Sequence, residues 1–119
     1  MAEHNDFGHW GEELAASFLR DKGYVILERD WRSGHRDLDI IAMDGDVLVF
    51  VEVKTRRNRD FMDPEAALDY RKLNSLRLSA NHYIKSHHLD NTYRFDVVTI
   101  VGSLFSHPEI NHIKDFAVL

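Results

Sequence analysis

The chain has 119 residues, of which 44% are hydrophobic and 29% are charged, and its formal net charge is -5 at pH 7. This length and composition predict one globular domain over residues 1–119 with a single hydrophobic core, and they exclude an intrinsically disordered chain. The sequence contains no cysteine, so disulfides, zinc–thiolate sites, iron–sulfur clusters and thiol nucleophiles are excluded as well.

The location of the protein is predicted from features that the sequence lacks. The opening MAEHNDFGHW has neither the basic nor the apolar region of a signal peptide, and no apolar run approaches the length of a membrane span. We therefore expect a cytoplasmic protein with no membrane partner. The acidic net charge also argues against a general nucleic-acid-binding protein, whose affinity comes largely from basic residues.

Apolar residues at helical spacing predict a first helix over residues 5–22, and Gly23 supplies its C-terminal stop. Gly8 and Gly11 lie in its first turns, where each costs about 1 kcal/mol relative to alanine, so we expect a close backbone approach there. Glu12 lies at the edge of the apolar stripe and would reach the following strands if the helix packs across them. The alternative is that Glu12 simply suits the positive end of the helix.

A strand over residues 24–31 is followed by two apolar segments that predict a β-hairpin over residues 36–54. The dipeptide Asp44-Gly45 between these segments favours a two-residue turn with positive φ. The opposite pairs predicted from this turn are Ile41 with Leu48, Asp39 with Phe50, and Asp37 with Glu52.

Four charged residues interrupt these apolar strands. Because side chains alternate along a strand, this register places on one face Asp37, Asp39, Glu52 and Lys54. Asp39 and Glu52 become diagonal neighbours with Cβ atoms about 7 Å apart, close enough for both carboxylates to bind one ion. Grouped carboxylates persist when protons, cationic side chains or a metal ion compensate them, and oxygen ligands of this kind suit Mg²⁺ or Mn²⁺.

If a metal ion binds at this position, the site is suited to phosphodiester hydrolysis. The ion can polarise a phosphate oxygen and lower the pKa of a water, while the Lys54 ammonium orients that water or stabilises charge in the transition state. A basic run follows directly and would contact a nucleic-acid backbone: Arg56, Arg57 and Arg59. Two alternatives stay open, because a Glu-x-Lys pair on a strand is also typical of a solvated face and a basic run is also typical of a solvated loop.

The second half of the chain predicts one more helix and two more strands. Asp63 as N-cap and Pro64 at the first helical position begin a helix that runs to about Ser86. A strand follows over residues 92–101, and the strand–helix–strand order favours a right-handed crossover with parallel pairing to the hairpin. A short strand over residues 109–113 completes a mixed sheet.

Six segments of the sequence together resemble one known family. They are GxxGEELAASFL (8–19), GYVILERDWR (23–32), RDLDIIA (36–42), VFVEVKTRR (49–57), PEAALDYRK (64–72) and RFDVVTI (94–100). The chain resembles the YraN-like family of uncharacterised proteins, which looks like a branch of the PD-(D/E)xK nuclease superfamily near the Holliday-junction resolvases. The resemblance covers nearly the whole chain.

This resemblance implies a fold and a set of roles. The fold would be an α/β restriction-endonuclease-like core in the order helix, three strands, helix, strand, with a mixed central sheet flanked by helices. Glu12 would be the acidic residue of the first helix and Asp39 the motif aspartate. Glu52 and Lys54 would be the acidic and basic members of the Glu-x-Lys motif, so that Asp39, Glu52 and Glu12 hold the metal.

The leading hypothesis is thus a Mg²⁺- or Mn²⁺-dependent endonuclease acting on DNA or structured nucleic acid, branched or junction DNA included. Lys72 matches a basic position of the family's second helix and would contact the nucleic acid, and Asp37, where the family more usually has glutamate, is a secondary metal ligand. A homodimer would suit the cutting of two symmetric strands. The alternatives are a nucleic-acid-binding or adaptor module without hydrolysis, and a structural ion network.

Overall fold

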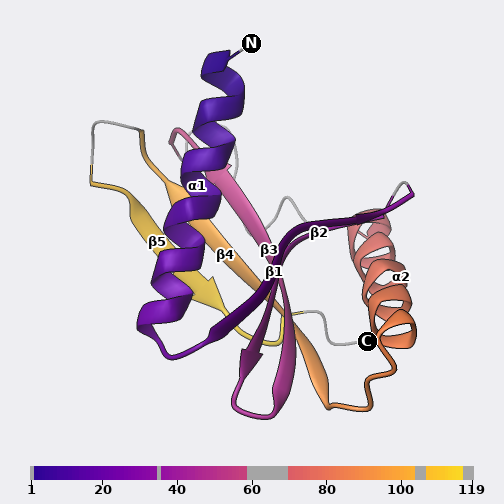
Figure 1. The fold of residues 1–119 in the computed structure, drawn as a ribbon. Coiled ribbons are helices and arrows are strands. Elements are labelled where there is room, and N and C mark those ends of the chain that lie inside the picture. Colours follow the sequence, from indigo (N-terminus) through magenta and orange to yellow (C-terminus); the bar gives the residue numbers. More distant parts are fainter. Residues whose placement is uncertain (1, 35, 59–69, 104–106, 117–119) are drawn as a thin grey trace.

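The computed structural model describes residues 2–34, 36–58, 70–103 and 107–116. The elements follow in the order α1 (Ala2–Asp21), β1 (Val25–Ser33), β2 (Arg36–Asp44), β3 (Val47–Arg56), α2 (Tyr70–Ser86), β4 (Tyr93–Val101) and β5 (Glu109–Ile113) (Figure 1). This order confirms the predicted helix, three strands, helix and strand, followed by the predicted short last strand. The predicted N-cap Asp63 and first helical residue Pro64 lie outside the described residues. Among the described helices, none is long and apolar enough to cross a membrane.

The strands form one mixed sheet in the order β1-β2-β3-β4-β5. β3 and β4 are parallel, as the crossover through α2 predicted, and the other neighbours are antiparallel. β3 is central and buried on both faces over residues 48–52, which explains why its sequence is a nearly continuous apolar run.

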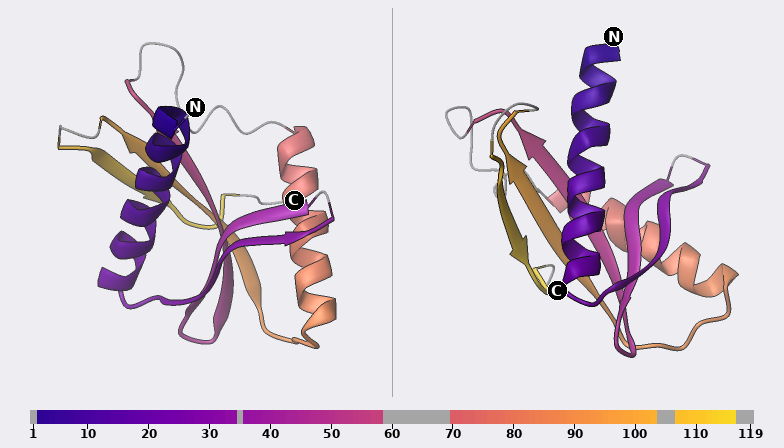
Figure 2. Two further views of the ribbon diagram at one scale, coloured as in Figure 1. Left: turned by 45° about the horizontal axis from the view of Figure 1, so that its top comes forward. Right: turned by 60° about the vertical axis from the view of Figure 1, so that its left-hand side comes forward.

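The two helices lie on opposite sides of this sheet (Figures 1 and 2). The first cluster of buried residues joins the apolar stripe of α1 to one face of the sheet, and it includes Ala15, Ala16, Leu19, Ile40, Ala42, Val49, Val51, Val98 and Ile100. The second cluster joins α2 to the other face, and it includes Leu38, Ile41, Leu48, Phe50, Leu76, Ala80, Tyr83 and Phe95. The sheet is therefore covered on both faces, and the charged residues buried in it, Glu52 and Asp96, form ion pairs.

The backbone of α1 approaches β3 most closely at Gly11. A Cβ atom at this position would collide with the side chain of Thr55, so only glycine permits the contact. The predicted close approach is therefore confirmed at Gly11. It is wrong at Gly8, where no described atom lies within 4 Å of the position that a Cβ would take.

The turn of the β2–β3 hairpin lies one residue further along than predicted. Asp44 pairs with Val47, so the two turn residues are Gly45 and Asp46. Of these two, Gly45 has a positive φ of 61° and Asp46 does not, as in a type II′ turn with glycine at its first central position. Asp44 thereby stays in the strand, where its carboxylate forms an ion pair of 3.0 Å with Arg94.

This change moves β3 by two residues along β2. Ile41 pairs with Phe50 and Met43 with Leu48, so the predicted pair Ile41–Leu48 is wrong. The predicted pairs of Asp39 and Asp37 on β3 depend on the same turn and are displaced with it.

A buried ion network attaches β5 to β4. The Asp96 side chain is 0% exposed and accepts hydrogen bonds from Arg94 Nε at 2.9 Å and from the backbone N–H of Asp115 at 3.1 Å. The Nε2 atom of His112 on β5 lies 2.8 Å from the same carboxylate, and its Nδ1 atom lies 2.9 Å from the Lys22 ammonium. Because each charged group has a partner, the network can be buried at the end of α1 without an orphaned charge.

Candidate active site

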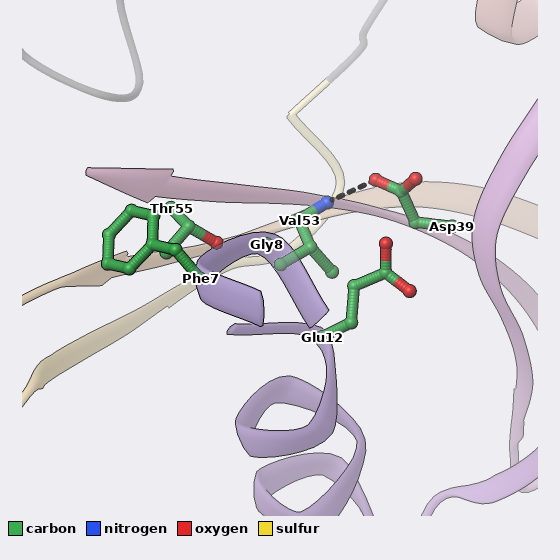
Figure 3. Close-up of a pocket in the computed structure, with 6 residues that line it drawn as sticks. All are labelled: Phe7, Gly8, Glu12, Asp39, Val53 and Thr55. Atoms are coloured by element: carbon green, nitrogen blue, oxygen red, sulfur yellow. Dashed lines mark hydrogen bonds between the residues drawn. The ribbon is translucent and has the colours of Figure 1, made fainter. Parts of the chain in front are cut away.

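A pocket of about 220 Å³ opens between α1, β2 and β3 (Figure 3). Its lining residues are Phe7, Gly8, Glu12, Asp39, Val53 and Thr55. Figure 3 shows the carboxylates of Glu12 and Asp39 pointing toward one another from α1 and β2. The structure thus brings Glu12 to the hairpin, as the packing of the first helix across the strands would require.

Asp39 lies where β2 leaves β3. The pairing of these strands ends at Ile40 and Val51, whereas β1 and β2 stay paired up to their connecting turn and curve toward α2 (Figure 2). Just past the last pair, Asp39 Oδ2 accepts a hydrogen bond of 2.9 Å from the backbone N–H of Val53. The carboxylate therefore replaces a backbone partner and is held in the gap between the two strands.

The predicted alternation of faces does not hold at this end of β2. Ile40 packs in the cluster under α1 but Leu38 packs in the cluster under α2, although strict alternation would place both on one face. β2 therefore rotates between these residues, and Asp39 turns its carboxylate to the pocket beside α1. Glu52 lies on the side of α2, where it contacts Lys72. The predicted common face for Asp39 and Glu52 is wrong in this respect.

Asp30 of β1 supplies a third carboxylate that the sequence analysis missed. Its neighbours Arg29 and Trp31 pair with Ile40 and Leu38, so Asp30 lies across from Asp39. Oxygen atoms of Glu12, Asp30 and Asp39 all lie within 4.8 Å of one another. A signal was available in the sequence, because a tight turn after residue 33 would fix the register of β1 on β2 and so place Asp30 opposite Asp39.

The electrostatics of this group favour protons or a cation. Burial raises the pKa of Glu12 from 4.5 to about 8, helped by the adjacent Asp30, which can share a proton with it, and by the charge of Asp39. Burial also raises the pKa of Asp39 from 3.8 to about 7, and the charges of Glu52 and the exposed Asp37 add to the effect. The Oε1 atom of Glu12 is buried and accepts no hydrogen bond from any residue that the structure describes.

Glu52 lies outside the group of three carboxylates and is bound by two lysines. Its Oε2 atom is 3.4 Å from Lys54 Nζ and 3.2 Å from Lys72 Nζ, and the Glu52 side chain is only 6% exposed. Burial acts to lower the pKa of Lys72, but the Glu52 carboxylate outweighs it and the pKa is raised. Both ammonium groups therefore lie against the Glu52 carboxylate on β3, the strand that also contributes Val53 and Thr55 to the pocket.

The basic residues beyond β3 are placed differently from one another. Arg56 is half-buried, and its guanidinium donates a hydrogen bond of 2.9 Å to the Thr55 carbonyl. Arg57 is exposed, and its guanidinium carbon lies 4.5 Å from the ring centroid of Phe7. Arg59 lies outside the described residues. Among the predicted basic contacts that the structure describes, Arg57 combines exposure with contact to Phe7, which lines the pocket.

Comparison with known proteins gives one family. The description "Uncharacterised protein family UPF0102" matches residues 11–100. A UPF0102 protein of Bacteroides thetaiotaomicron is 44% identical over 115 residues, covering 97% of this chain and 94% of its own length. A UPF0102 protein of Porphyromonas gingivalis is 47% identical over 103 residues, covering 87% of this chain and 76% of its own length. One from Flavobacterium psychrophilum is 44% identical over 100 residues, covering 84% of each chain.

Proposed function

Because this chain belongs to the uncharacterised protein family UPF0102, whose name states no activity, we propose a function from the site itself. The protein would be a metal-dependent endonuclease that hydrolyses phosphodiester bonds of DNA or structured nucleic acid. One observation carries the proposal. Carboxylates from α1, β1 and β2 converge within 4.8 Å beside β3, the strand that carries Lys54 in an ion pair with Glu52, and two of them line the pocket.

The carboxylate group suits a divalent cation such as Mg²⁺ or Mn²⁺. Its donors are oxygen atoms, which these ions prefer. The buried Oε1 atom of Glu12 accepts no hydrogen bond from the described residues. The pKa values of Glu12 and Asp39 are raised first by burial and then by the neighbouring carboxylates, and Arg29 and Lys72 offset only part of this effect. Glu12, Asp30 and Asp39 would hold the ion, with Glu52 as a further candidate once it leaves its lysines.

Each residue of the site has a role that follows from its position. A bound divalent cation would supply positive charge at the phosphate and favour ionisation of a water. The hydrogen bond from Val53 keeps the Asp39 carboxylate in place. Lys54, held by Glu52 at 3.4 Å, would stabilise negative charge that develops on the phosphoryl oxygens. Lys72 would orient Glu52 through their 3.2 Å ion pair, in addition to the direct nucleic-acid contact expected from the sequence.

A second candidate function is a nucleic-acid-binding module without hydrolysis. The contacts of Glu52 favour it, because a carboxylate bound by two ammonium groups is already neutralised without a metal ion. This candidate predicts salt-dependent binding of nucleic acid that Mg²⁺ and Mn²⁺ do not convert into cleavage.

The test is a cleavage assay with end-labelled single-stranded, duplex, nicked and branched substrates in Mg²⁺, Mn²⁺ or EDTA. Metal-dependent cleavage should fall by about 100-fold or more in Asp39→Asn and in Lys54→Ala. Glu13→Gln is the matched control, because Glu13 is the exposed neighbour of Glu12 and should leave cleavage unchanged. Cleavage that persists in Glu52→Ala and Lys54→Ala would contradict these assignments, and no cleavage in either metal would favour the second candidate.

A further inference from the structure

Phe7 lines the pocket and stacks on Trp10 of the same helix and on the Arg57 guanidinium. We propose that this stack, together with Gly8, binds an unpaired nucleotide strand. The substrate of the site would then be a nucleic acid with a single-stranded part. The inference rests on the proposed function only in taking nucleic acid as the ligand of the site.

The Trp10–Phe7–Arg57 stack joins α1 to the end of β3. The rings of Phe7 and Trp10 are stacked with centroids 5.6 Å apart and planes inclined by 24°. The guanidinium carbon of Arg57 lies over the Phe7 ring at 4.5 Å from its centroid. Phe7 also lines the pocket that holds the carboxylates of Glu12 and Asp39, so the stack and the acidic group border the same cavity.

Arg57 presents its guanidinium on the surface beside Phe7. It is exposed, and its guanidinium forms no hydrogen bond or ion pair with any other residue in the part of the chain that the structure describes. The neighbouring Arg56 differs, because its guanidinium is bonded to the Thr55 carbonyl. Stacking on Phe7 orients the Arg57 guanidinium, whose donors fit a phosphate and whose plane can stack on a nucleobase. A base would extend the stack by one more flat layer.

Gly8 connects the stack to the carboxylates. It precedes Glu12 by four residues on α1, which places both on one side of the helix. Glycine inside a helix costs about 1 kcal/mol relative to alanine, and Gly8 has no close neighbour that requires it. Gly11 does have one in Thr55. Gly8 lines the pocket, so the bare helix surface there leaves room for a strand to pass from Arg57 to the acidic group.

An unpaired strand fits this surface better than a duplex. Each base inside a duplex is already stacked on both faces, whereas an unpaired base can stack on aromatic rings and guanidinium planes. The net charge of -5 also gives the protein little general attraction for the dense charge of a duplex. Affinity must then come from local stacking and from Arg57.

The experiment measures dissociation constants in EDTA, so that no cleavage occurs, by fluorescence anisotropy with labelled DNA single strand, RNA single strand and DNA duplex of the same sequence. We expect one of the two single strands to bind at least about tenfold more tightly than the duplex. Phe7→Leu keeps an apolar side chain but removes the ring, and should weaken single-strand binding by about five- to 100-fold. Phe7→Trp should restore it. Arg57→Gln should weaken binding and reduce its salt dependence. Arg20→Gln, which removes an exposed arginine from the last turn of α1, should do neither.

Two variants separate binding from folding. Gly8→Ala adds a methyl group in open space, so it should preserve or raise the melting temperature while weakening single-strand binding. Tyr93→Leu removes an aromatic ring that is 50% exposed at the start of β4, away from the pocket residues, and should leave single-strand binding unchanged. Equal affinity for duplex and single strands, or unchanged binding in both Phe7→Leu and Gly8→Ala, would overturn the inference. The cleavage assay tests the proposed function separately. If the protein binds single strands but never cleaves them, only the proposed nuclease function is contradicted. If it cleaves duplexes equally well without the Phe7 ring, only this inference is contradicted.

Discussion

Removing the negative charge of Glu12 should stabilise the metal-free protein at alkaline pH. The folded protein holds Glu12 in a pocket that raises its pKa from 4.5 to about 8, first by burial and then through Asp30 and Asp39. A carboxyl group whose pKa is raised by folding gives its full stability below its unfolded pKa, and that stability is lost as the pH rises through the folded pKa. Wild-type stability should therefore fall between about pH 4.5 and about pH 8, and Glu12→Gln should escape the part of this loss due to Glu12.

The size of the effect follows from the same values. Moving a pKa from 4.5 to about 8 corresponds to about 5 kcal/mol once the group is ionised, at about 1.4 kcal/mol for each pH unit. Glu12 is only partly buried, and water screens part of the repulsion. We therefore expect Glu12→Gln to raise the free energy of unfolding by about 1–3 kcal/mol at about pH 9, and to change it little at about pH 5.

Urea denaturation followed by circular dichroism in EDTA at both pH values measures this difference. Glu13→Gln is the control, because Glu13 is exposed and its pKa is lowered by the hydrogen bond with Arg29. It should show no gain at about pH 9. If Glu12→Gln is no more stable than the wild-type protein at alkaline pH, or if the gain is the same at both pH values, Glu12 does not lie in an acidic cluster and the site loses its first ligand.

Three further outcomes are expected. In a thermal shift assay, Mn²⁺ should raise the melting temperature of the wild-type protein and leave that of Asp39→Asn unchanged. Each tenfold excess of Mn²⁺ over its Kd should add about 1.4 kcal/mol to the free energy of unfolding. Equal shifts in both proteins would contradict a metal site at Asp39. Gly11→Ala should lower the free energy of unfolding in urea by about 1–3 kcal/mol because the new Cβ would collide with Thr55. Adding Thr55→Ala to the same chain should restore most of this stability. Additive losses would mean that the two residues do not touch. Asp96→Asn should cost about 3 kcal/mol at neutral pH, because it leaves the buried end of Arg94 without its 2.9 Å partner. Since folding lowers the pKa of Asp96, that loss should shrink as the pH falls below about 4, and a loss independent of pH would refute the ion pair as its cause.

The order of elements and the parallel pairing of β3 with β4 could be predicted from the sequence because they depend on long periodic segments and on the handedness of the crossover. The hairpin register could not, since it depends on which residue of the turn takes positive φ. Asp44-Gly45 and Gly45-Asp46 are both plausible turn pairs by composition. The ion pair of Asp44 with Arg94, 50 residues further along the chain, favours the second, and no local pattern contains that contact.

The same kind of long-range geometry decides which carboxylates meet. Alternation along a strand correctly places Glu52 and Lys54 together, because both lie on the regular part of β3. It fails at Asp39, where β2 separates from β3 and the side chain bonds to the Val53 backbone. Alternation also does not predict the position of Asp30, because its φ of 51° departs from that of a regular strand. A site at a point where strands diverge cannot be predicted from the alternation of side chains, because that alternation is interrupted there.

The charges around Asp39 explain why the site should select a divalent cation over a monovalent one. Five carboxylates act on this small region, and three cationic side chains offset part of their charge. The carboxylates are those of Glu12, Asp30, Asp37, Asp39 and Glu52, and the cations are Arg29, Lys54 and Lys72. Without an ion, burial and the remaining negative charge both favour protons, so the pKa values of Glu12 and Asp39 are raised. One divalent cation would balance the same charge and displace those protons, whereas a monovalent ion would leave one of the carboxylates protonated. The same group of buried carboxylates that lowers the stability of the metal-free protein at alkaline pH should therefore make the affinity for Mg²⁺ or Mn²⁺ increase with pH.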